Sequence, residues 1–144
     1  MRRASLPWAP GLLLLLVAAC GPPAGTPHLT GLRCATPDGC QAPQDPFLLK
    51  LAVDFSDTDG DLGNGTYSLW LDQQTLIQDD PLATLFQSSK LDASKPAGVL
   101  YLDAPLKLAN VTDGMTFWVD LEVTDASGHA SNRPGVQFTL NLKQ

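Results

Sequence analysis

The chain has 144 residues, of which 44% are hydrophobic and 17% charged, and its formal net charge is −6. This length allows one domain with a core large enough to fold unaided, and the composition excludes a chain that is wholly disordered or membrane-embedded. The acidic surplus would repel polyphosphate, which argues against a nucleic-acid partner.

The N-terminus has the features of a secretion signal, because two arginines precede an apolar run at 11–19 that is too short to span a bilayer. Residues 17–20, Val-Ala-Ala-Cys, resemble the lipobox of bacterial lipoproteins. The resemblance implies a signal peptide at 1–19, lipidation of Cys20 with palmitate-type chains, and a lipid-anchored place in the bacterial cell envelope. Gly21 after the cysteine resembles lipoproteins of the outer membrane. The alternative is an ordinary signal peptide with an unmodified cysteine.

Residues 20–28 are rich in Pro and Gly, which predicts a tether between the anchor and a domain at 29–144. Cys34 and Cys40 follow, separated by a turn sequence that would bring their sulfurs together. In an oxidising compartment this spacing predicts a disulfide at the domain entrance. A thiol pair for metal or redox chemistry is the alternative, although the Cys-x-x-Cys pattern is absent.

The rest of the chain consists of short apolar segments separated by turn residues, and none has a helical period over three turns. Apolar residues alternate with polar ones at 47–55, 67–71, 117–123 and 136–142, and shorter apolar runs lie at 82–86, 99–102 and 106–108. The run at 82–86 fits either a strand or a helical turn, and residues 103–105 are expected to separate the last two runs. About seven short strands predict an all-β, antiparallel sandwich.

The sequence FWVDLEVTDASGHAS, followed by VQFTLNL, resembles the last two strands of bacterial immunoglobulin-like domains. The resemblance covers about residues 45–144 and implies an immunoglobulin-like sandwich. In that family such domains are mostly adhesive, spacing or binding modules rather than enzymes. Cys34 and Cys40 depart from the family pattern, because they are too close in sequence to bridge two sheets.

An acidic loop separates the first two alternating segments. Asp57, Asp59 and Asp61 stand two residues apart among glycines, and closely spaced carboxylates on a tight turn can supply several of the oxygens that calcium requires. The loop is not an EF-hand, because Leu62 and Ser68 occupy the positions of the required Gly and Glu. It resembles the Asp-x-Asp-Gly-Asp-(Leu/Ile)-Gly segment of many bacterial surface lipoproteins with sandwich domains.

Immunoglobulin-type connectivity would place loops 56–65 and 125–135 at the same end of the sandwich. Asp125 is therefore expected to join the three loop aspartates in a calcium site, with Asp54 as a weaker candidate. The alternative is a solvated turn, since Asp and Gly are the commonest turn residues. Leu62 would then only pin the loop to the core.

Trp70 and Trp118 are expected on the faces opposite the apolar residues of their strands, where they could stack on a protein or glycan partner. Burial under a loop or an edge is the alternative. His28 and His129 lie outside any recognisable nucleophile or zinc motif. The sequence thus predicts a membrane-anchored, non-catalytic structural or binding module of the envelope. An accessory subunit or inhibitor of a secreted enzyme, or a small hydrolase, is the alternative.

Overall fold

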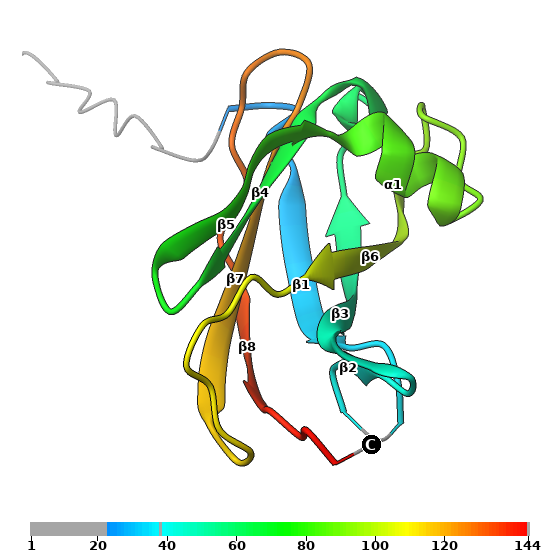
Figure 1. Ribbon diagram of the computed structural model, residues 1–144. Coiled ribbons are helices and arrows are strands. Elements are labelled where there is room, and N and C mark those ends of the chain that lie inside the picture. The colour runs from blue at the N-terminus through cyan, green and yellow to red at the C-terminus, as the bar shows by residue number, and fades with distance from the viewer. Residues whose placement is uncertain (1–22, 38, 144) are drawn as a thin grey trace, which may run out of the picture.

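The structure, a computed structural model, describes residues 23–37 and 39–143 (Figure 1). Two antiparallel sheets face each other and enclose a hydrophobic core. The described residues form eight strands and one short α-helix, which confirms the predicted antiparallel β-sandwich. The proposed signal peptide and Cys20 lie outside the described residues.

The first sheet is built on the long strand β3, Asp45–Ser56. Strands β1, His28–Cys34, and β2, Gln41–Ala42, pair with the two halves of β3 along one edge. Strand β6, Ala97–Pro105, pairs with the other edge of β3. Because β1 and β2 share an edge, this sheet of four strands is only three strands wide.

The second sheet has the order β5-β4-β7-β8. Its strands are β4 at Thr66–Leu71, β5 at Gln74–Pro81, β7 at Thr116–Thr124 and β8 at Gly135–Thr139. The chain crosses between the sheets from β3 to β4, from β5 through α1 to β6, and from β6 to β7, whereas β7 and β8 are neighbours. The crossing from β3 to β4 was expected from the sequence, and the loops after β3 and β7 lie at one end of the sandwich, as predicted (Figure 1).

Alternation along the strands explains the core. In β3 the residues from Leu49 to Phe55 on one face are buried, and in β7 the same holds from Phe117 to Val123. Phe47, expected on the same face of β3, is instead 38% exposed because it lies near the start of the strand. Each buried Val, Leu or Phe side chain stabilises the folded state by about 1.5–3 kcal/mol.

Two segments differ from the sequence prediction. The expected break at 103–105 is wrong, since β6 continues to Pro105 and residues 106–108 form no strand. Proline is tolerated there because it ends an edge strand, where its missing N–H disrupts no ladder. Strands β1 and β5 were not predicted, because neither has a clean alternation.

The ambiguous run at 82–86 is helical and belongs to α1, Leu82–Ser88. Leu82, Leu85 and Phe86 are buried, and this spacing of three and four residues forms one apolar face. Within the described part of the chain, no helix has the length and hydropathy needed to cross a bilayer.

Polar side chains tie the two sheets together at both ends of the sandwich. At the end that carries the acidic loop, the Asn132 side chain accepts from Leu29 N (2.7 Å) and donates to Leu29 O (2.8 Å). At the opposite end, Gln41 makes the same pair of bonds with the backbone of Asn141 (2.7 and 3.2 Å). The predicted disulfide between Cys34 and Cys40 is present.

Candidate metal centre

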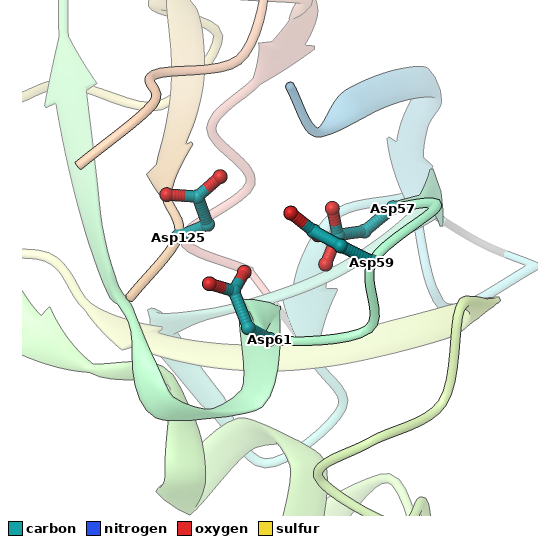
Figure 2. Close-up of side chains that lie close together, drawn as sticks. All are labelled: Asp57, Asp59, Asp61 and Asp125. Atoms are coloured by element: carbon teal, nitrogen blue, oxygen red, sulfur yellow. The ribbon is translucent and has the colours of Figure 1, made fainter. Parts of the chain in front are cut away.

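Four aspartates converge at the end of the sandwich where the chain leaves β3 and β7. Asp57, Asp59 and Asp61 come from the loop after β3, and Asp125 directly follows β7. One carboxylate oxygen from each lies within 4.8 Å of the others, and Figure 2 shows the four side chains turned toward a common point. The sequence-predicted residues are thus brought together, including the one that is distant in the chain.

Asp57 is the most deeply placed member of this aspartate cluster, at 1% exposed. Its Oδ2 accepts a hydrogen bond from the Leu62 backbone N–H at 3.0 Å. Its Oδ1 is buried and has no hydrogen-bond partner among the described residues. A buried carboxylate oxygen without a partner is costly, and this atom is available to coordinate a cation.

Asp61 and Asp125 are held by the loop after β7. Ser127 Oγ donates to Asp61 Oδ2 at 2.7 Å, whereas Asp61 Oδ1 is a second buried oxygen without a partner in the described chain. Asp125 is 4% exposed and accepts from the backbone N–H of His129 at 2.7 Å. Its other oxygen lies 3.1 Å from the Nδ1 of the same histidine. These bonds orient the two carboxylates and leave an oxygen of Asp61 facing the cluster.

The electrostatics of the cluster are unfavourable without a cation. The pKa of Asp57 is raised from 3.8 to about 6, chiefly by burial and next by a hydrogen bond to Asp59 that is available to the protonated form. The charges of Asp59 and Asp61 act in the same direction, whereas the Leu62 N–H lowers the pKa. The unpartnered Oδ1 and the raised pKa have one cause, which is the crowding of carboxylates in a partly dry site.

Close packing of the acidic loop depends on its glycines. Gly60 has φ +72°, which other residues rarely adopt, and a Cβ there would lie 2.8 Å from Ser94 O. A Cβ at Gly65 would overlap the carbonyl of Thr124, at the end of β7. Leu62 is fully buried beneath the loop, as expected. Gly65 therefore lets the loop approach the end of β7 closely enough for Asp125 to join it.

The donor set fits a hard cation, because all four ligands are carboxylate oxygens. Oxygens bound to one Ca²⁺ at 2.3–2.6 Å can be at most about 4.6–5.2 Å apart, whereas those around Mg²⁺ at 2.0–2.1 Å reach only about 4.0–4.2 Å. The candidate oxygens lie within 4.8 Å of one another, a spacing that a single Ca²⁺ can span.

The remaining candidate residues lie elsewhere. Trp70 is half-buried beneath Arg133, whose guanidinium carbon lies 3.5 Å from the ring centroid. Trp118 is 45% exposed, its Nε1 donates to Asp120 at 2.7 Å, and its ring lies against the backbone of Gly135. One face of the Trp118 ring is therefore covered, whereas Trp70 is occupied by an internal cation–π contact.

Asp54, the weaker candidate, does not join the cluster, because its side chain pairs with Arg33 on the neighbouring strand. Three contacts of the centre were not foreseen from the sequence: Ser127, His129 and Gly25, which packs against Asp59. The turn sequence Asp-Ala-Ser-Gly-His indicated a turn, but no signal in it pointed to the acidic loop.

Comparisons with protein-family models, with curated proteins and with solved structures found no match for this chain.

Proposed function

We propose that this chain is a lipid-anchored bacterial envelope protein whose non-catalytic β-sandwich binds one calcium ion through Asp57, Asp59, Asp61 and Asp125. The observation that carries the calcium site is the convergence of four carboxylates, two of them with a buried oxygen that lacks a partner among the described residues. The bound ion would supply the missing contacts and neutralise the mutual repulsion. Its role is structural, since it would join the loops that follow β3 and β7.

One hydrogen bond supports a structural role over a catalytic one. A hydrolase of the serine type needs a hydroxyl that donates to a histidine. Here the Ser127 hydroxyl donates to Asp61 and not to His129, while His129 contacts Asp125 through Nδ1. Both side chains are thus engaged in holding members of the aspartate cluster, which fits the positioning of metal ligands.

The proposed location in the bacterial cell envelope rests on residues 17–20, which lie outside the described residues. Acyl chains on Cys20 would form a stable anchor, because each buried methylene contributes about 0.8 kcal/mol. Mass spectrometry of the N-terminal peptide from membrane fractions tests this part of the proposal. An unacylated N-terminus would contradict it without affecting the calcium site.

A partner of the module, an envelope protein or a glycan, would meet exposed aromatic surface. Trp118 is the better placed of the two candidate tryptophans, because its ring is fixed by Asp120 and remains 45% exposed. Trp70 is covered by Arg133 and would contribute through that contact.

Calcium titration of the purified protein tests the proposed site. At a hundredfold excess over its Kd, a ligand that binds only the folded state stabilises it by about 2.7 kcal/mol. For a domain of this size that corresponds to a rise in Tm of about 10 °C. Asp59→Ala should abolish the rise, whereas Asp80→Ala, which removes the same charge from an exposed position on β5, should retain it. No rise at millimolar calcium in the unsubstituted protein would refute the site.

A further inference from the structure

Residues 23–27, called here the N-terminal cap, fold back over the acidic end of the sandwich. The Thr26 N–H and hydroxyl both donate to Pro23 O, at 3.1 and 2.7 Å. Gly25, the third residue of this turn, has φ +84°, as a type II turn requires. Gly25 and Pro27 are buried. The cap is therefore packed against the domain, although its composition is that of a linker.

The cap contacts the aspartate cluster through Asp59. A Cβ at Gly25 would overlap the Asp59 carboxylate, so the glycine backbone lies directly against it. Asp59 is also the one exposed member of the cluster. The cap therefore helps to orient the Asp59 side chain, whereas Asp57 and Asp125 are held by their burial in the domain.

The cap is also tied to the other half of the cluster. Its C-terminal end leads directly into Leu29, whose backbone N–H and carbonyl are both bonded by the Asn132 side chain. Asn132 belongs to the same loop as Asp125. The cap is consequently linked to the loop after β7 through the first residues of β1.

We propose that calcium binding and docking of the cap are linked, so that each stabilises the other. This inference rests on the calcium site proposed above. Without a cation, Asp57 and Asp61 repel the Asp59 carboxylate, which can turn toward water because it is exposed. The surface that Gly25 packs against is then lost. With the cation bound, Asp59 is held inward and the cap has its docking surface, and by reciprocity a docked cap favours the bound ion.

Two measurements on the purified full chain test the linkage. The first is hydrogen exchange of the backbone amides of residues 24–26 and 28 with and without calcium, which should be at least tenfold slower when calcium is bound. The second is calorimetric calcium affinity of Gly25→Ala, which should be at least tenfold weaker. Gly114→Ala is the matched control, because Gly114 has the same backbone angle, φ +85°, with no heavy atom near its Cβ position.

The outcomes separate the two proposals. If the unsubstituted protein binds no calcium, both the site and the linkage fail. If calcium binds but either the exchange of the cap or the affinity of Gly25→Ala is unchanged, the linkage alone is overturned. A folding defect in Gly25→Ala would not leave the question open, because the exchange measurement uses the unsubstituted chain.

Discussion

Asp57 is the member of the aspartate cluster whose surroundings most favour a bound cation. The carboxylate is buried, one oxygen is satisfied by Leu62, and the other has no partner in the described residues. Burial alone would favour the protonated acid, and the neighbouring carboxylates act in the same direction. A divalent cation reverses this balance, because it stabilises the charged form that burial penalises.

The raised pKa of Asp57 predicts an unusual pH dependence for the calcium-free protein. With a pKa of about 6 in the folded state and 3.8 as the reference, the folded protein binds more protons between these values. Stability should therefore fall as the pH rises from 3.8 through 6, by on the order of 2 kcal/mol from this group. Asp57→Asn keeps an acceptor for the Leu62 N–H but cannot ionise, so it should lack this component.

Chemical denaturation in the presence of a chelator measures the effect as a difference between the two proteins at each pH. The relative stability of the unsubstituted protein should decline across this window and level off above it. A difference that stays constant from pH 4 to 7 would contradict the prediction.

The aspartate cluster could be predicted from the sequence, because hard cations bind carboxylate oxygens and three aspartates alternate in the loop after β3. The contacts that orient the cluster could not be foreseen. Ser127 and His129 are ordinary turn residues whose partners are decided by how two loops meet. Gly25 was assigned to a tether on composition, and its packing against Asp59 depends on tertiary structure.

Among the elements, strands with clean alternation were predicted and those without it were missed. The alternating residues of β3 and β7 match their burial almost position by position. Strand β5 has exposed or half-buried residues throughout, so its sequence has no apolar face to reveal it. The extent of β6 was misjudged because Pro105 suggested a break, whereas it only ends the strand.

The loop after β7 should contribute to stability through Asn132, whose side chain bonds the backbone of Leu29 in β1. Asn132→Ala would leave the Leu29 N–H and carbonyl without their protein partners and should cost about 1–2 kcal/mol. Guanidinium unfolding measures this loss as a lower midpoint. Gln137→Ala, at an exposed position on β8, should change stability by no more than about 0.5 kcal/mol. Equal effects of the two substitutions would show that the Asn132 bonds contribute nothing.

For the whole molecule, the predicted connectivity of the strands was the most useful expectation for locating the candidate site. The prediction of a two-sheet sandwich with the loops at 56–65 and 125–135 at one end was enough to place Asp125 beside the acidic loop, although it lies 64 positions after Asp61. Sequence could not indicate how closely the loops approach, because that depends on the contacts of Gly60 and Gly65 with distant backbone.

The two ends of the sandwich should contribute to stability independently. Strand β1 has seven residues, which at about 3.3 Å per residue puts Cys34 about 20 Å from the start of the strand near the acidic loop. Replacing Cys34 and Cys40 by Ala opens a small loop and should cost about 2 kcal/mol. The rise in Tm caused by calcium should be unchanged, since sites this far apart are additive. A reduced calcium response in the double variant would show that the ends are coupled.

Under the proposed lipid anchor at Cys20, the packing of Gly25 against Asp59 would also limit the height of the domain above the bilayer. Five peptide steps join Cys20 to Gly25, and fully extended chain covers at most about 18 Å over that distance. A protein held by acyl chains at Cys20 would thus keep its carboxylate-rich end close to the lipid headgroups and present its disulfide end to whatever lies farther out. Release of residues 23–27 from the domain would lengthen the segment between Cys20 and the domain and let the domain change its orientation.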